Sequence, residues 1–186
     1  AINGPGALVT AEDTPLALQG GARLTVLDQQ AGTNLVLTVQ VSAGRLGLDP
    51  LASAGRTLTL QGSATTISQA LAGLTYLPDA DFNGADMLHA DLADGANPSR
   101  TTAGKFGITI TAVNDAPTLS GSRWVNAAPG ATTLIDTSML NAQDVDDAAI
   151  DLVYTLGATP GQGDLLLRGQ RLVAGGGRVP GGHGHP

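Results

Sequence analysis

The residues of this chain best suited to chemistry are the oxygen-bearing side chains of Asn114 and Asp115, which precede Ala116 and Pro117. The residue before a proline is pushed towards extended geometry, so this segment cannot continue a helix. It predicts a joint between two β-type units, with a carboxylate and an amide oxygen held side by side. Oxygen ligands of this kind suit a hard cation such as Ca²⁺, which can collect them from both neighbouring units.

The acidic residues are unusual in kind as well as in number. The formal net charge is −7, from 16 Asp and Glu against 9 Lys and Arg, and Glu12 is the single glutamate of the chain. Aspartate is favoured both in turns and as a cation ligand. Two interpretations therefore stay open: a loop-rich β protein uses Asp in its turns, or several of these residues coordinate Ca²⁺.

Catalytic chemistry is disfavoured by the residues available for it. His89 is the one histidine outside the C-terminal end, Lys105 is the single lysine, and cysteine is absent. None of the motifs GxSxG, HExxH or GxxxxGK[ST] occurs. Asp79 and Asp81 lie close together, but in a Pro-flanked stretch where such residues serve turn geometry. The sequence predicts a protein that is not an enzyme.

Composition excludes further classes of protein. A nucleic-acid binder carries a basic stripe, which is missing here, and no run approaches 18 apolar residues, so membrane insertion is not expected. The lack of cysteine removes disulfides, and calcium would supply another means of stabilising an extracellular chain. No signal peptide is evident. The start, Ala1–Pro5, is similar to a degraded copy of 112–117, which predicts an excerpt of a longer array.

Hydrophobic periodicity predicts an all-β first unit over residues 1–114. In 35–42, leucines and valines alternate with polar residues, which is typical of a half-buried strand. Helical spacing predicts one short helix near 66–72, capped by Thr65 or Thr66. About seven short strands in such a length describe a β-sandwich. The clearest expected strands are 35–42, 45–48, 57–61, 74–77, 86–92 and 106–112.

The second unit is expected over residues 115–173, with strands at 132–135, 152–156 and 164–167. A sandwich repeat needs roughly 100 residues, so this unit is predicted to be partial. Residues 174–186 are predicted to be a flexible Gly-rich tail without strands. Its His183 and His185 are spaced to chelate a transition metal weakly, and an unstructured terminus is the alternative.

Several stretches resemble known extracellular repeats. The segment 113–117, the run Glu12-Asp13-Thr14 and the run LTYLPDADFNG at 74–84 resemble the cadherin-like tandem repeats of large bacterial surface adhesins. Residues of about 118–173 resemble part of a chondroitin-sulfate-proteoglycan-type repeat, through 137–140, 144–147 and 154–172. The resemblance implies tandem immunoglobulin/cadherin-like β-sandwich repeats, the second truncated, in a secreted or cell-surface protein.

The resemblance also implies a calcium site at the junction. In cadherin-type repeats, acidic residues of both domains and of the linker surround the ion. The linker here departs from the Asp-x-Asn-Asp-Asn-Ala-Pro pattern of animal cadherins, because Val113 precedes Asn114 and Ala116 replaces the second Asn. The residues carried over as Ca²⁺ ligands are Glu12, Asp13, Asp94, Asn114, Asp115, Asp144 and Asp146, with Asp91 as a further oxygen source.

The function expected from these features is that of a non-enzymatic, calcium-stiffened spacer or adhesive segment of a bacterial adhesin-like protein. Its partners would be neighbouring repeats of the same chain and a cell-surface or matrix ligand. One alternative is a carbohydrate- or matrix-binding accessory domain of a secreted hydrolase, which the few aromatic platforms, Trp124, Tyr76 and Tyr154, disfavour. Another is a structural module without a ligand.

Overall fold

A computed structural model describes residues 1–28, 34–48, 55–95, 97, 100–122 and 124–175, and the backbone of 178–180. The chain divides into two compact units, Ala1–Val113 and Asn114–Pro186. His183 and His185, expected to lie in a tail, are outside the described residues. No helix in the described ranges is long and apolar enough to cross a membrane.

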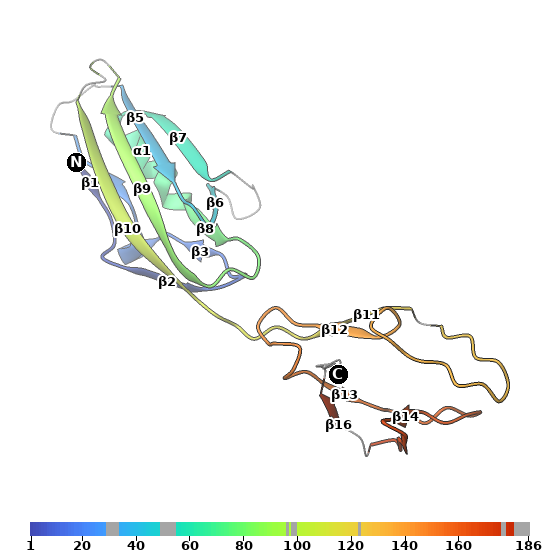
Figure 1. Cartoon of the computed structure of the whole chain (residues 1–186). Helices are drawn as coiled ribbons and strands as arrows, with labels where there is room; N and C mark the ends of the chain where they lie inside the picture. Colours follow the sequence, from blue (N-terminus) through green and yellow to red (C-terminus); the bar gives the residue numbers. More distant parts are fainter. Residues whose placement is uncertain are drawn as a thin grey trace. The chain divides into compact units, whose positions relative to one another are not determined.

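The first unit contains a five-stranded sheet in the order β2-β10-β9-β5-β7 (Figure 1). Alternate residues of β5 are buried, which confirms the predicted inward face of Leu35, Leu37 and Val39. β10 is antiparallel to β9 but parallel to β2, a pairing that sequence periodicity did not predict. The strands are β2 (Leu8–Ala11), β5 (Leu35–Gln40), β7 (Thr57–Gly62), β9 (Gly84–Asp94) and β10 (Thr101–Thr111).

A three-stranded sheet in the order β3-β8-β6 shares one hydrophobic core with the five-stranded sheet. Leu46 and Tyr76 from the smaller sheet pack in the same cluster as Leu37 and Leu88 from the larger one. The remaining elements are β1 (Ile2–Asn3), β3 (Leu16–Ala17), the 3₁₀ turn η1 (Gly20–Ala22), β4 (Thr25–Val26), β6 (Gly44–Gly47) and β8 (Thr75–Pro78), with β1 paired to β4.

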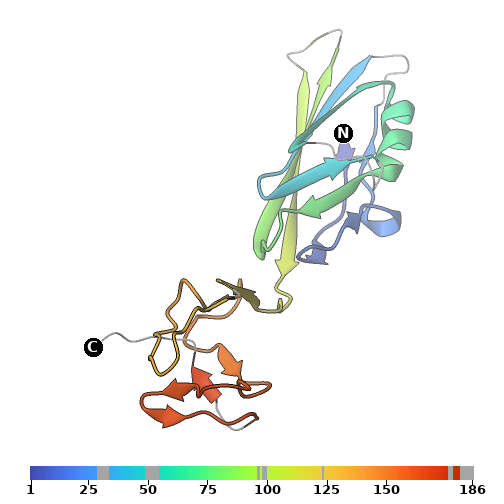
Figure 2. The ribbon, with the colours of Figure 1, turned by 90° about the vertical axis from the view of Figure 1, so that its right-hand side faces the viewer.

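The predicted short helix is confirmed as α1 (Ala64–Ala70), which continues into the 3₁₀ turn η2 (Leu71–Gly73). Its cap differs from the prediction: the Ser63 hydroxyl accepts from the Thr66 N–H at 3.1 Å, so the helix starts before Thr65. Ser fits this position because its oxygen satisfies a free N–H group of the first turn. Figure 2 shows α1 and the long strands β9 and β10 at opposite sides of the first unit.

A buried carboxylate joins the two sheets. Asp86 of β9 accepts hydrogen bonds at 3.0 Å from the N–H groups of Ser42 and Ala43, where the chain passes from β5 to β6. It also accepts one from the Tyr76 hydroxyl at 2.9 Å. Burial raises the pKa of the Asp86 carboxyl, but the N–H groups of Ala43, Met87 and Ser42 and the Tyr76 hydroxyl outweigh it and hold that pKa below its usual value.

The second unit consists of short two-stranded pairs: β11 with β12, β13 with β16 and β14 with β15. Among its described apolar residues, Leu152 alone is buried. The hairpin of β14 and β15 turns through Arg168 and Gly169, both with positive φ, as a two-residue turn requires. The strands are β11 (Thr118–Ser120), β12 (Asn141–Gln143), β13 (Val153–Thr155), β14 (Leu166–Leu167), β15 (Gln170–Arg171) and β16 (Arg178–Pro180).

The predicted all-β class with one short helix is confirmed, but details of the second unit are corrected. The strand expected at 132–135 is wrong, since that segment has no regular structure. The strands expected at 152–156 and 164–167 are present in shortened form. The expectation that no strand follows Leu172 is also wrong, because β16 pairs with β13. Thr and Leu favour strands only where a partner strand accepts their hydrogen bonds, and 132–135 has none.

Candidate functional site

The candidate site lies at one end of the five-stranded sheet of the first unit. β2 and β10 run parallel and finish there at Ala11 and Thr111, while the antiparallel β9 starts there at Gly84. Three chain segments therefore meet at this end: the loop after β2, the loop before β9 and the residues that follow β10. We call this region the Glu12 end, after its buried carboxylate.

Glu12 continues the buried face of β2 one residue beyond the strand. Its side chain is 2% exposed, and its own N–H donates to the carbonyl of Thr111 at 3.0 Å. Its Oε1 accepts the N–H of Val113 at 2.5 Å, and its Oε2 accepts from Asn83 Nδ2 at 3.4 Å. A buried carboxylate normally needs a charged partner or strong hydrogen bonds, and both of these donors are neutral. Glu12 thus ties the last residue of the first unit to its sheet.

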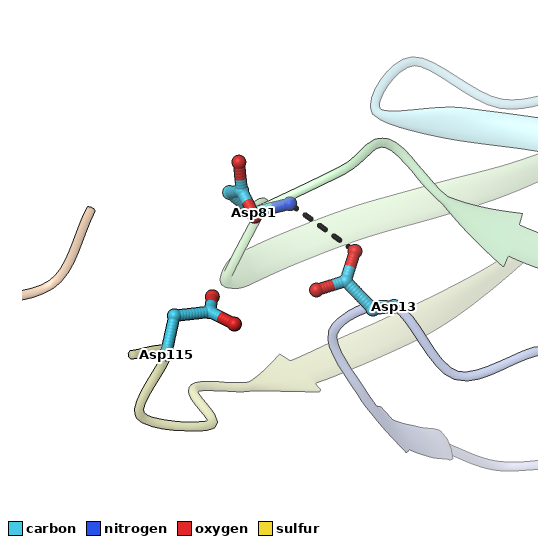
Figure 3. A group of neighbouring side chains, drawn as sticks. All are labelled: Asp13, Asp81 and Asp115. Carbon is cyan, nitrogen blue, oxygen red and sulfur yellow. Dashed lines mark hydrogen bonds between the residues drawn. The ribbon is translucent and has the colours of Figure 1, made fainter. Parts of the chain in front are cut away.

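Two more carboxylates lie beside Glu12, on separate loops. Asp13 Oδ1 accepts the N–H of Asp81 at 3.3 Å, which Figure 3 draws as a dashed line. Both residues have positive φ, 55° and 56°, a conformation that Asp tolerates better than most side chains. Asp115, drawn in the same figure, is the second residue of the second unit.

The charge balance at the Glu12 end is negative. Among the described residues, neither Glu12 nor Asp13 nor Asp81 is paired with an arginine or lysine. Arg56 forms an ion pair at 2.6 Å with Asp79, two residues before Asp81. Exposed carboxylate oxygens next to a buried one are ligands that a hard divalent cation prefers. The described residues thus bring carboxylate oxygens together at the Glu12 end, an arrangement whose chemistry suits a cation.

Asp81 and Asn83 were missed as site residues by sequence reasoning, which assigned this stretch to a turn. The turn is real, since the Phe82 N–H donates to the Asp79 carbonyl at 3.2 Å. Its proximity to Glu12 and Asp13 depends on the register of β9 against β10 and of β10 against β2. Sequence periodicity carries no signal for such a register.

In the second unit, the structure brings together Asp115, Asp144 and Asp146. The Asp115 N–H donates to Asp146 Oδ2 at 2.7 Å, and Asp144 Oδ1 accepts the N–H groups of Asp146 and Asp147 at 2.9 and 3.0 Å. Asp144 Oδ2 is buried and has no hydrogen-bond partner in the described part of the chain. Asp144 and Asp147 also line a hollow of about 380 Å³ together with Ala116.

The joint between the units is thereby fixed on each side. Val113 is held by Glu12 within the first unit, and Asp115 is held by Asp146 within the second. Asn114 is the single residue between these two anchored positions, and its Nδ2 donates to the carbonyl of Asp115 at 2.7 Å.

Asp94 and Asp91 are not brought to this end. β9 starts beside Asn83 and runs for 11 residues to Asp94, a length of about 33 Å for an extended strand. Asp94 is thus at the far end of the sheet, and its predicted place among the ligands near the linker is wrong. His89 lies midway along β9, on the face opposite to the buried Leu88 and Ala90.

Comparison with known proteins gives one informative similarity. The chain is 32% identical over 121 residues to the mouse protein named extracellular matrix organizing protein FRAS1, a match that covers 64% of this chain. The matched region is 3% of the length of that protein, so the chain spans a small part of it. No protein-family model and no solved structure match the chain. The similarity supports an extracellular, non-catalytic repeat module as the coarse assignment.

Proposed function

We propose that the chain is a non-catalytic spacer or adhesive segment of a large extracellular, adhesin-like protein of the bacterial surface, stiffened by Ca²⁺ at the joint between its units. The coarse part of this proposal is supported by the all-β fold and by the similarity to a matrix organizing protein. The calcium part is supported by the residues of the Glu12 end. A spacer needs a joint that resists bending, and a bound ion is one way to provide it.

The observation that carries the proposal is the buried Glu12 carboxylate, which holds the Val113 N–H at the point where the chain leaves the first unit. Asp13 and Asp81 surround this point without a cationic partner among the described residues. Without an ion, these carboxylates repel one another; with Ca²⁺, the same charges become ligands. Cation binding would therefore favour the conformation in which Glu12 holds the end of β10.

Chain connectivity supplies a reason for the linker to take part. Asp115 follows Val113 by two residues, so its Cα stays within about 7 Å of the Val113 Cα in any conformation. Val113 is itself fixed at the Glu12 end. We therefore propose Asp115 as the linker's ligand to the cation, and such a ligand would restrict the torsions of Asn114.

A calcium titration followed by urea unfolding tests the proposal. For a site of roughly 10⁻⁴ M, about 10 mM Ca²⁺ should raise the free energy of unfolding of the first unit by about 2.7 kcal/mol. Asp13→Asn and Asp81→Asn should each remove most of this gain. Asp91→Asn is the matched control, because Asp91 is an exposed carboxylate far along β9 from the Glu12 end.

Small-angle scattering gives the second readout. Chelation should widen the distribution of distances between the units if the ion stiffens the joint. An unfolding free energy that is indifferent to calcium, or equal effects of the Asp81 and Asp91 variants, would contradict the calcium proposal and favour a structural module without a ligand.

The carbohydrate- or matrix-binding alternative has one observation in its favour. Trp124 is 86% exposed, so its ring is available as a flat platform of the kind that stacks on sugars. The Ser122 hydroxyl donates to the Trp124 carbonyl at 2.9 Å and orders the backbone there. Glycan-array binding that disappears in Trp124→Ala and does not need calcium would support this second function.

A further inference from the structure

Three steps along the chain pair an Asn or Asp with a following glycine: Asn3-Gly4, Asn83-Gly84 and Asp94-Gly95. At an Asn-Gly step, the glycine backbone nitrogen can attack the Asn Cγ, because no side chain hinders it. A bond forms between that nitrogen and Cγ, the Cγ–Nδ2 bond breaks, and ammonia leaves with the amide proton. Water then opens the five-membered imide at either carbonyl, which gives aspartate or isoaspartate.

Two of the three steps are held in place by their surroundings. The Gly95 N–H donates to the Asn34 carbonyl at 2.7 Å, and that oxygen would lie 2.2 Å from a Cβ at Gly95. Asn3 is paired with Thr25 in the β1–β4 ladder. Gly4 lies against the Phe106 ring, which would be 2.4 Å from a Cβ at that position. Both glycines are thus closely packed at Cα, which restricts the backbone movement that the attack needs.

Asn83-Gly84 is different. Both residues are exposed and lie where the loop after Asp79 enters β9. Gly84 is the first residue of β9 and pairs with Ile110 of β10, but the nearest atom to a Cβ at Gly84 would be at 3.7 Å, on the Phe82 ring. Gly84 also has a φ of 132°, a region that side chains other than glycine rarely adopt. Of the three steps, this one has the most open space at the glycine Cα, and it lies at the very start of the β9–β10 pairing.

We propose that Asn83-Gly84 is a site of spontaneous deamidation, at which the folded protein converts its own Asn83 to aspartate or isoaspartate. The conversion changes the contact with the buried carboxylate. Asn83 Nδ2 donates to Glu12 Oε2, and a carboxylate at position 83 has no proton to donate. A second negative charge then faces Glu12, beside Asp13 and Asp81. The product would act as a slow, irreversible change of charge at the Glu12 end.

The site itself is tested by ageing the whole chain at mildly alkaline pH and mapping its peptides by mass spectrometry. We expect a gain of about one mass unit to accumulate at Asn83 several-fold faster than at Asn3, with isoaspartate detected at Asn83 by methyltransferase labelling. Asn83→Gln should remove that signal, and Asn3→Gln should leave it. Equal rates at the two asparagines, or an unmodified Asn83, would overturn the proposal.

The consequence is tested on unfolding. In calcium-free buffer, Asn83→Asp should lower the midpoint of thermal unfolding of the first unit by several degrees, while Asn3→Asp should leave it within error. Asn83→Ser removes the amide without adding charge, so its unfolding midpoint should lie between those of Asn83→Asp and Asn3→Asp. An Asn83→Asp protein that unfolds like the unmodified chain would show that the charge at this position does not act on Glu12.

Discussion

The two units of this chain are both built from β-strands, yet they are stabilised in different ways. In the first unit, two sheets and a helix pack around one shared core. Its longest strands, β9 and β10, each contain 11 residues. The second unit has strands of two or three residues and buries Leu152 alone among its described apolar side chains. Isolated two-stranded pairs are only marginally stable in water.

The difference shows what strand length contributes. A long strand can present several inward side chains to an opposing sheet, so the burial of each one supports the others. Short pairs depend on local contacts instead, such as the Asp144 carboxylate that accepts two N–H groups of its own turn. We infer that order is long-range in the first unit and local in the second, and matched substitutions in the two units can test this.

The largest expected contrast is between Leu88→Ala and Leu166→Ala. Leu88 is 0% exposed in the core of the first unit, so its truncation leaves a cavity and should cost about 2–5 kcal/mol of unfolding free energy. Leu166 is 56% exposed in β14, and its truncation should change stability by less than about 0.5 kcal/mol. Urea unfolding followed by circular dichroism measures both.

Hydrogen exchange provides an independent check on the same contrast. Amides of β5 and β10 should be strongly protected, and those of β13 and β14 should exchange much faster. Comparable protection in the two units would show that the second unit is a complete fold, and the inferred dependence on local contacts would then be wrong.

A smaller contrast concerns two tyrosines whose hydroxyls are both hydrogen-bonded. The Tyr76 hydroxyl shares its one proton between the Ala43 carbonyl and the buried Asp86, whereas the Tyr154 hydroxyl accepts the Ala142 N–H at 2.8 Å. Tyr76→Phe removes a bond to a charged group and should cost about 1.5–3 kcal/mol. Tyr154→Phe should leave the unfolding free energy of the first unit unchanged.

The pH dependence follows from Asp86. Its pKa is lowered in the folded state, so its contribution to stability is present above the unfolded value near 4 and is lost as pH falls through the folded pKa. Below about pH 4, the free energy of unfolding should therefore fall less steeply with decreasing pH in Tyr76→Phe, because one of the hydrogen bonds that favour the charged Asp86 carboxylate is gone. The same dependence of the unfolding free energy on pH below about 4 in the unmodified protein and in Tyr76→Phe would contradict this role of Asp86.

Much of the first unit could be predicted from sequence because its signals are local. Alternation in 35–42 and 86–92 marks the strands, and the spacing around Ile67 marks the helix. The same signal fails in 132–135, because alternation describes a side-chain pattern and says nothing about whether a partner strand exists. β16, which contains Pro180 in a Gly-rich stretch, forms only through its pairing with β13.

The candidate site was predicted only in part, for a related reason. Glu12 and Asp13 are predicted through the resemblance to cadherin-like repeats, but Asp81 reaches them through the register of three strands. The sequence predicts Asp94 at the linker end of the first unit, but Asp94 occupies the opposite end of β9. The uninterrupted length of β9 decides the matter, and sequence reasoning had recognised only part of that strand.

The smallest contrast compares two capping side chains. The Ser63 hydroxyl accepts the Thr66 N–H and caps α1, whose Ile67 is buried in the core, so Ser63→Ala should cost about 1 kcal/mol in the unfolding of the whole first unit. Asp136 in the second unit accepts the N–H and the hydroxyl of Ser138, bonds that also lower the pKa of its carboxyl.

Asp136→Ala should disturb only its own turn, with backbone NMR shifts confined to residues 136–140. The reason is that α1 is coupled to a shared core, whereas the turn at Asp136 is exposed and supports no buried side chain. Chemical-shift changes that spread from Asp136→Ala to β13 and β14 would show cooperative order in the second unit. If order is long-range in the first unit and local in the second, Ser63→Ala should lower the stability of the whole first unit. Asp136→Ala should then change only the shifts of its own turn.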